Sequence, residues 1–164
     1  AFLDYAVACQ QLPENPMRNL RIHRQRIGRT RVLTVPEVER LLEQPDPTTP
    51  TGLRDWALLV FLYATGARPS EVAAAERTDL VDDLFHVRHG KKSRQRLIPL
   101  PEYGLQSLRQ YLSRRQDDHP ALFLGARGRA LSARRITALV RRYARQAGLE
   151  TDPEQLGHVT AMTL

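Results

Sequence analysis

The chain has 164 residues, 41% of them hydrophobic, which is enough for one buried core and too few for two large domains. Its 25 Lys and Arg against 18 Asp and Glu give a formal net charge of +7, which favours an anionic partner such as nucleic acid. A single cysteine, Cys9, excludes an intrachain disulfide and a cysteine-rich zinc site, and no apolar run is long enough to span a membrane. We therefore expect a cytoplasmic protein without a membrane segment.

The amino-terminal region has the character of a linker. Residues 2–11 are predicted to be the end of a helix, which Pro13 and Pro16 stop. A helix that begins at the first residues is expected to belong to a preceding domain. Residues 21–31 carry five arginines and no acidic residue, which favours an extended basic segment able to lie along a phosphate backbone. The alternative is a disordered arm without a target.

A helical core is predicted from Thr34 onward. Thr34 and Glu37 form a capping-box pattern, so a helix is expected to run to about Gln44, where prolines follow. Residues 51–66 are apolar on nearly all sides and predict a second helix in the centre of the core. Gly66 is expected to end that helix, and Pro69 to begin a short one.

The hydrophobic period then changes to that of a β-hairpin. Residues 84–88 alternate between apolar and polar, residues 90–95 form a polar basic turn, and residues 96–100 are apolar again. Further on, the pattern predicts a helix from Pro101, a short strand at 121–124, and a helix from Ser132 to Ala147 that Gly148 stops. The fold class is therefore α+β, mainly helical, with a small antiparallel sheet on one side.

The most specific string is LYATGARPSEV at residues 62–72. It places Arg68 between a buried helix and a short following one, where its backbone is fixed and its guanidinium can face a phosphate bidentately. Glu71 is close enough to pair with basic groups and to hold the turn. The alternative is that Arg68 serves only a salt bridge to Glu71.

Two lysines stand out among the basic residues. Of 25 Lys and Arg, only Lys91 and Lys92 are lysine, and both lie in the predicted hairpin turn. Arginine stays protonated in proteins, whereas lysine can release its proton when its surroundings favour it. The composition therefore indicates a role in proton transfer, with a chance occurrence on a solvated turn as the alternative.

The string around Arg68 resembles the first conserved box of the tyrosine recombinase and phage integrase family, which includes the Xer recombinases. The box has the form TGxRxSE, and it is matched by Thr65, Gly66, Arg68, Ser70 and Glu71. The resemblance implies the fold of the catalytic domain of these enzymes. It also implies that Arg68 grips the scissile phosphate and neutralises charge in the transition state, with Glu71 as its structural support.

The predicted hairpin is similar to the second box of the same family. Residues 90–100 read GKKSRQRLIPL, which fits the family pattern G-K-x-x-[KR]-x-R-x-[IV]-P-L. By that resemblance Lys91 is the general acid that protonates the departing 5′ oxygen. Lys92 is the neighbouring candidate, and the register favours Lys91. Arg94 and Arg96 are expected to contact DNA.

The last predicted helix is expected to meet DNA at its amino end. Ser132, Arg134 and Arg135 lie at its start, where charge and backbone amides can reach phosphates together. In the family, the equivalent helix lies against the DNA. Arg21 and Arg24 of the basic segment are expected to add further DNA contacts. A solvated basic face is the alternative for this helix.

The resemblance is ambiguous after residue 149. One alignment places residues 153–158 on the family's H-x-x-R box, where glutamate would replace the histidine. The other, which we prefer, places EQLGH at 154–158 on the later L-G-H box, so that His158 would donate a hydrogen bond to the scissile phosphate. Under either alignment the nucleophilic tyrosine is absent, and the chain as given is expected to be inactive.

Taken as a whole, the resemblance implies a site-specific DNA recombinase or integrase that cleaves and rejoins strands through a 3′-phosphotyrosyl intermediate. Residues 1–33 would be the end of a core-binding domain with its linker, and residues 34–164 the catalytic domain. Double-stranded DNA and a homo- or hetero-tetramer on DNA are the expected partners, with no metal or cofactor, and the protein would be nucleoid-associated. The alternatives are a catalytically dead DNA-binding remnant or regulator of the same fold, and an unrelated basic RNA- or DNA-binding module.

Overall fold

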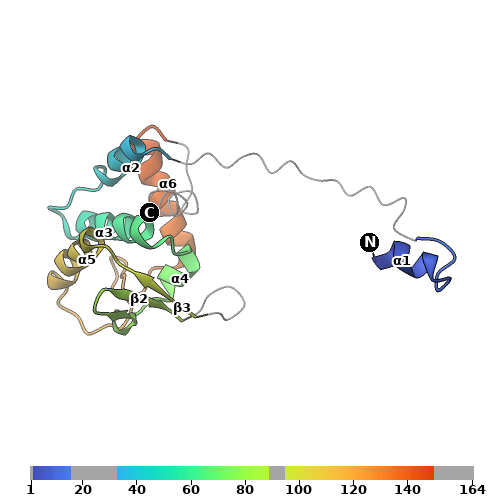
Figure 1. Ribbon diagram of the computed structural model, residues 1–164. Helices are drawn as coiled ribbons and strands as arrows, with labels where there is room; N and C mark the ends of the chain where they lie inside the picture. Colours follow the sequence, from blue (N-terminus) through green and yellow to red (C-terminus); the bar gives the residue numbers. More distant parts are fainter. Residues whose placement is uncertain (1, 16–32, 89–94, 150–164) are drawn as a thin grey trace. The chain divides into compact units, whose positions relative to one another are not determined.

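The computed structural model describes residues 2–15, 33–88 and 95–149 (Figure 1). The chain divides into two compact units, Ala1–Thr30 and Arg31–Leu164. In the first unit, the described residues contain the helix α1, Phe2–Ala8. No helix among the described residues is long and apolar enough to cross a membrane.

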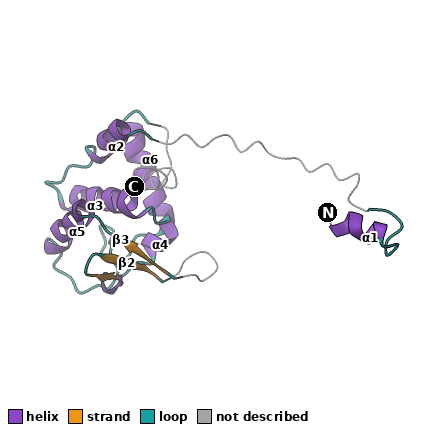
Figure 2. Ribbon diagram, in the orientation of Figure 1, coloured by secondary structure: helices purple, strands orange, loops and turns teal. Residues whose placement is uncertain are grey.

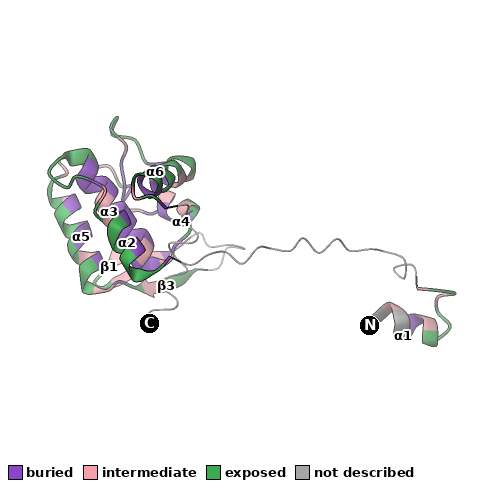
Figure 3. Ribbon diagram, turned by 90° about the horizontal axis from the view of Figure 1, so that it is seen from above, coloured by how far each residue is buried: buried purple, intermediate pink, exposed green. Residues whose placement is uncertain are grey.

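The second unit is built around one buried helix, α3, Pro50–Thr65. Its amino end is capped by Thr49, whose hydroxyl accepts a hydrogen bond from the Gly52 amide at 3.0 Å, and proline occupies its first helical position. Most of its side chains are buried, as the apolar sequence predicted. Figure 3 shows that α5, by contrast, buries one side and exposes the other.

The other helices surround α3. They are α2, Val35–Leu42; α4, Pro69–Ala73; α5, Glu102–Ser113; and α6, Ala133–Gln146. The predicted capping box at the start of α2 is confirmed, because Glu37 accepts a hydrogen bond from the Thr34 amide at 2.9 Å. The helices predicted from the apolar spacing are therefore all present, with ends within a few residues of those expected.

A small sheet packs against this helical core (Figure 2). Its three antiparallel strands run in the order β1, Leu80–Val81; β2, Leu84–Val87; and β3, Arg96–Pro99. The predicted hairpin is thus confirmed, and it pairs Val87 with Arg96 at the end next to residues 89–94. The strand β1 and the short 3-10 helix η1, Arg77–Asp79, were not predicted.

Aromatic rings join the sheet to the helices. The ring of Phe61 on α3 lies edge-on to Phe85 of β2, with 4.9 Å between centroids, and 5.7 Å from Phe123. Phe123 in turn stacks on Tyr111 of α5 at 5.5 Å. Such pairs add to the free energy of burial, so this cluster holds four parts of the chain in one core.

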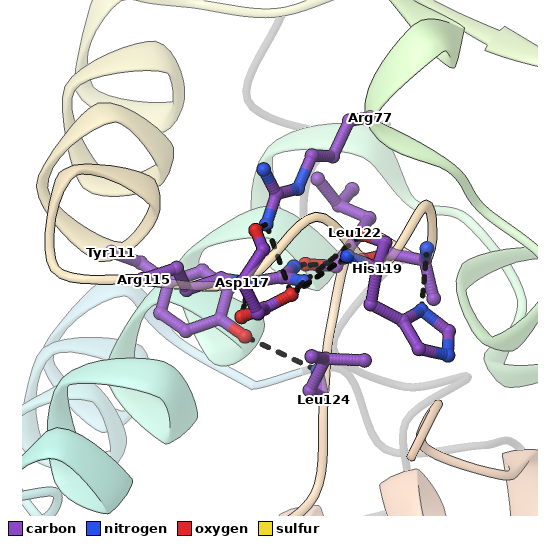
Figure 4. A network of polar contacts seen from close by, with 8 residues as sticks. Arg77, Tyr111, Arg115, Asp117, His119, Leu122 and Leu124 are labelled. Carbon is purple, nitrogen blue, oxygen red and sulfur yellow. Dashed lines mark hydrogen bonds and ion pairs between the residues drawn. The ribbon is translucent and has the colours of Figure 1, made fainter. Parts of the chain in front are cut away.

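The strand predicted at 121–124 is wrong. Ala121 and Leu124 each form only an isolated bridge, with Glu76 and Ala130 respectively. Its backbone has mixed partners instead of a strand ladder. Arg115 donates to the carbonyl oxygens of Ala121 and Leu122 at 2.7 and 2.9 Å, and the Leu124 amide donates to the Tyr111 hydroxyl at 3.1 Å (Figure 4). The Leu122 amide donates to the Ala75 carbonyl at 2.8 Å. The apolar run is buried, as expected, but without strand neighbours.

A buried carboxylate ties α3 to α6. Asp55 is fully buried and accepts hydrogen bonds from Nε of Arg54 at 2.8 Å, from Arg142 at 2.9 Å and from the Tyr143 hydroxyl at 2.9 Å. The Arg142 guanidinium also lies over the Tyr143 ring, 4.4 Å from its centroid. The Asp55 carboxylate is therefore the shared acceptor for donors from both helices.

The Arg115 side chain organises a second network, near the end of α5 (Figure 4). Its side chain is only 6% exposed and donates to Asp117, which also pairs with Arg77 at 3.2 Å. The hydrogen bonds from Arg115, together with those of the His119 amide and the charge of Arg77, lower the pKa of Asp117 to about 2. Asp117 is thus ionised at neutral pH, where its carboxylate accepts from both arginines.

Replacing Asp55 should destabilise the fold strongly. Asp55→Ala leaves the buried Arg54 without its anionic partner, and breaking a buried pair in this way costs about 3–5 kcal/mol of unfolding free energy. Urea unfolding followed by circular dichroism measures the loss. Asp118→Ala, which removes an exposed carboxylate, should stay within about 0.5 kcal/mol of the wild type; equal effects of the two changes would show that Asp55 does not hold α3 to α6.

The Asp117 network should make stability depend on acid pH. Because the pKa of Asp117 is lowered on folding, its contribution is present above the pKa of the unfolded chain, about 4, and is lost as the pH falls through about 2. Asp117→Asn should therefore lose less stability than the wild type between about pH 5 and pH 2. Urea midpoints at the two pH values test this, with Asp118→Asn as the matched control; an unchanged pH dependence in Asp117→Asn would contradict it.

Candidate functional site

The turn after α3 sets the direction of the chain at Arg68. Gly66 adopts the left-handed conformation, with φ 58° and ψ 17°, and its amide donates to the Leu62 carbonyl at 3.0 Å. The Thr65 hydroxyl donates to the Phe61 carbonyl at 2.6 Å and accepts from the Ala67 amide at 3.2 Å. The residues of the TGAR string therefore close the helix and turn the backbone toward α4.

The Arg68 backbone is held at the start of α4. Arg68 is the residue before the first helical position, which Pro69 occupies, and its amide donates to Oε2 of Glu71 at 2.8 Å. Its guanidinium is half exposed, and Nη1 lies 3.6 Å from Oε1 of Glu71. That separation is an ion pair longer than a hydrogen bond, so the guanidinium can still bind a second anion.

The Glu71 carboxylate has a closer partner in Arg96. Nη1 and Nη2 of Arg96 donate to Oε1 and Oε2 at 2.9 and 2.7 Å, which is the bidentate fork geometry of strong arginine–carboxylate pairs. The Glu71 side chain is only 1% exposed. Burial raises its pKa, but the hydrogen bonds from Arg96 and the Arg68 amide and the charges of both arginines outweigh burial and lower it. Glu71 is therefore an ionised carboxylate.

These three side chains form what we call the arginine–glutamate cluster: Arg68, Glu71 and Arg96. Two guanidinium groups share one carboxylate, so the cluster keeps one positive charge. The head of Arg68 is half exposed, whereas the carboxylate is covered. The arrangement is able to hold an anion such as a phosphate at Arg68 while its backbone stays fixed.

A second basic group surrounds the amino end of α6. The Ser132 hydroxyl caps this helix by accepting from the Arg135 amide at 3.4 Å, and Arg134 and Arg135 are exposed. Arg135 borders two pockets: one of about 300 Å³, lined also by Arg54 and Arg142, and one of about 230 Å³, lined also by Arg127 and Arg129.

Sequence reasoning did not single out Arg127 and Arg129 as site residues. The available signal was the GARGR turn directly before the Ser132 cap, which places two arginines next to the amino end of a helix. Both arginines are exposed.

Several expected site residues lie outside the described residues. They are Arg21, Arg24, Lys91, Arg94 and His158. Of the others, the structure brings Arg68, Glu71 and Arg96 together, and it places Ser132, Arg134 and Arg135 at the amino end of α6. Within residues 2–15, 33–88 and 95–149, no three His, Cys, Asp or Glu side chains form a group that could hold a metal ion.

Gly66→Ala should destabilise the turn that presents Arg68. A Cβ at a left-handed residue costs about 1–2 kcal/mol. The free energy of unfolding, measured by urea titration, should therefore fall by that amount. Gly125→Ala is the matched control, because a Cβ there would meet its nearest atoms at 3.5 Å, an ordinary contact. If Gly66→Ala is as stable as Gly125→Ala, the left-handed turn is not required.

Comparison with known proteins agrees with this geometry. Residues 31–164 match the Phage integrase family. The tyrosine recombinase XerC of Chlamydia trachomatis serovar L2 is 32% identical over 170 residues, which cover 98% of this chain and 54% of that protein. The tyrosine recombinase XerD of Chlorobaculum tepidum is 37% identical over 148 residues, which cover 83% of this chain and 48% of the relative. The chain thus spans about half the length of these relatives.

Solved structures share the fold. The XerA recombinase superposes with a TM-score of 0.70 at 25% identity, covering 82% of this chain and 50% of that one. The integrase of the transposon Tn1549, solved in complex with circular intermediate DNA, gives a TM-score of 0.74 at 19% identity over 98% of this chain and 61% of that one. The expected catalytic-domain fold is confirmed, and the chain belongs to the Phage integrase family.

Proposed function

We propose that this chain is the greater part of the catalytic domain of a site-specific DNA recombinase or integrase, which cleaves and rejoins DNA strands through a 3′-phosphotyrosyl intermediate. The observation that carries the proposal is the arginine–glutamate cluster, in which the half-exposed guanidinium of Arg68 projects from a backbone held by Glu71. The named relatives are tyrosine recombinases. Their identity favours an enzyme over a non-catalytic DNA-binding remnant.

In the proposed reaction, the tyrosine oxygen attacks the phosphorus and the bond to the 5′ oxygen breaks. Arg68 binds the phosphate oxygens and stabilises the charge that develops on them. Lys91 gives its proton to the departing 5′ oxygen, and His158 donates a hydrogen bond to the same phosphate. The free 5′ hydroxyl of a partner strand then attacks the phosphotyrosine, which restores a phosphodiester and releases the tyrosine.

The nucleophile is proposed to be none of the five tyrosines of this chain. Tyr111 and Tyr143 are buried, and their hydroxyls are bonded to the Leu124 amide and to Asp55. Tyr63 is partly buried on α3, and Tyr103 lies 6.2 Å from it on α5, in a ring-to-ring contact. Tyr5 belongs to the other compact unit. This chain alone is therefore expected not to cleave DNA.

The proposed DNA-binding face is the amino end of α6. Arg134 and Arg135 supply charge there, and the first amides of the helix point toward an anion placed at its end. Arg127 and Arg129 extend the same basic surface along the neighbouring pocket. Arg21, Arg24 and Arg94 are proposed to add phosphate contacts from the linker and the hairpin turn.

The proposed organisation follows from this role. Residues 1–33 would be the end of a core-binding domain with its linker, and residues 34–164 the catalytic domain. Strand exchange between two duplexes needs several protomers, so a homo- or hetero-tetramer on double-stranded DNA is proposed; one solved protein of the same fold is a lambda integrase tetramer bound to a Holliday junction. Such a protein would act in the cytoplasm, at the nucleoid.

The test uses the complete recombinase that contains this chain. Arg68→Ala should bind DNA with near wild-type affinity and form the covalent protein–DNA adduct about 10²–10³-fold more slowly, because one transition-state donor is lost. The adduct is measured by denaturing gel electrophoresis on a labelled duplex. Normal adduct formation in Arg68→Ala would refute the proposed role.

A matched variant separates binding from chemistry. Arg134→Ala combined with Arg135→Ala should weaken DNA binding and reduce the slope of log affinity against log salt by about 2, since two phosphate contacts are removed. If this double variant binds like the wild type, the face at α6 is not the DNA-binding surface.

A further inference from the structure

We propose that Arg96 is a positioning residue for Arg68: by occupying the Glu71 carboxylate, it keeps the Arg68 guanidinium available for phosphate. The proposal rests on the proposed function of Arg68 as the phosphate-binding group. It gives Arg96 a role different from the direct DNA contact that its place in the sequence suggested.

The carboxylate contacts show how the three side chains are shared. Oε2 of Glu71 accepts from Nη2 of Arg96 at 2.7 Å and from the Arg68 amide at 2.8 Å. Oε1 accepts from Nη1 of Arg96 at 2.9 Å and faces Nη1 of Arg68 at 3.6 Å. Arg96 therefore makes the two short side-chain contacts to Glu71, and Arg68 only a long one.

Competition for the buried carboxylate follows from these distances. Glu71 is covered from solvent, so its charge has to be balanced by protein groups. Without the Arg96 fork, Arg68 is the nearest cation to the Glu71 oxygens within the described part of the chain. Closing the gap of 3.6 Å would bring its guanidinium into a full hydrogen-bonded pair. A guanidinium engaged in that way is turned from the phosphate it is proposed to bind.

The position of Arg96 in the sheet gives the contact a second consequence. Arg96 is the first residue of β3 and pairs with Val87, the last residue of β2. The segment between these strands carries Lys91, the proposed general acid. The pair with Glu71 thus fastens the base of the hairpin to the start of α4, and links the elements that carry the two proposed catalytic groups.

A direct contact of Arg96 with DNA would be a different use of the same side chain. Two of its five N–H groups donate to Glu71, so a phosphate could be reached only by the remaining ones, on the exposed side of the guanidinium. The two roles therefore predict different results when Arg96 is changed, one in the rate of the reaction and the other in the affinity for DNA.

The kinetic test compares Arg96→Ala, Arg96→Lys and Arg109→Ala in the complete recombinase. Arg109 pairs with Glu102 on the exposed side of α5 and serves as the control for the loss of one charge. Arg96→Ala should slow adduct formation at saturating DNA by about 100-fold, as expected for a displaced catalytic group, and change Kd no more than Arg109→Ala does. Arg96→Lys should recover part of the rate, because lysine can restore one of the two contacts to Glu71.

A double-mutant cycle with Glu71→Gln tests whether Arg96 affects the reaction through Glu71. If Arg96 acts through Glu71, adding Arg96→Ala to Glu71→Gln should slow the reaction by less than about 3-fold beyond the single change, since contacting residues are not additive. Additive losses, or a loss in Kd with a salt slope lower by about 1, would show a direct DNA contact and overturn the proposal. Thermal unfolding of each variant verifies that it is folded at the assay temperature.

A measurement without DNA separates this proposal from the proposed function. Nuclear magnetic resonance of ¹⁵N-labelled arginine side chains reports the Arg68 Nε–H group in the chain itself. In Arg96→Ala its hydrogen exchange should slow at least several-fold as Arg68 closes onto Glu71, whereas Arg109→Ala should leave it unchanged. An unaltered Arg68 signal in Arg96→Ala would overturn the positioning role even if the enzyme is a recombinase, and absence of adduct in the wild type would refute only the function.

Discussion

The buried Glu71 carboxylate is the constraint on which the proposed site depends. A charge removed from water is tolerated only with partners, and Glu71 takes them from two elements that are distant in sequence: the Arg68 amide at the start of α4 and the Arg96 fork at the start of β3. The same contacts fix the backbone of Arg68 and leave its guanidinium half exposed. One ionised side chain therefore joins the helical core, the sheet and the candidate phosphate-binding group.

Arginine has two distinct uses in this chain. At Arg54, Arg96 and Arg115 the guanidinium is bonded to a carboxylate, and at Arg54 and Arg115 it also donates to backbone carbonyl oxygens. Arg54 and Arg96 thereby join segments far apart in sequence, and Arg115 holds the loop that follows α5. At Arg134 and Arg135 the side chains are exposed beside a helix amino end, which suits the binding of phosphates. The high net charge thus overstates the basic surface, because part of the arginine holds the fold together.

Much of the fold could be predicted from sequence because its signals are local. The capping box at Thr34, the apolar residues 51–66 and the alternation at 84–88 each mark an element within a few residues of its true ends. The strand predicted at 121–124 was wrong because its backbone pairs with the side chains of Tyr111 and Arg115 and with single backbone groups of Ala75 and Leu131. Of the site, Arg68 and Glu71 followed from one string, whereas the partner of Arg96 lies 25 residues away in the chain and has no local signal.

The central claim is that Arg68 binds a DNA phosphate while Arg96 holds Glu71. The most direct measurement is a crystal structure of the complete recombinase bound to a duplex that contains its recombination site. The account predicts the Arg68 guanidinium within hydrogen-bonding distance of the scissile phosphate, with both terminal nitrogens of Arg96 still on Glu71. A structure in which Arg68 is closed onto Glu71 and Arg96 contacts the phosphate would contradict it.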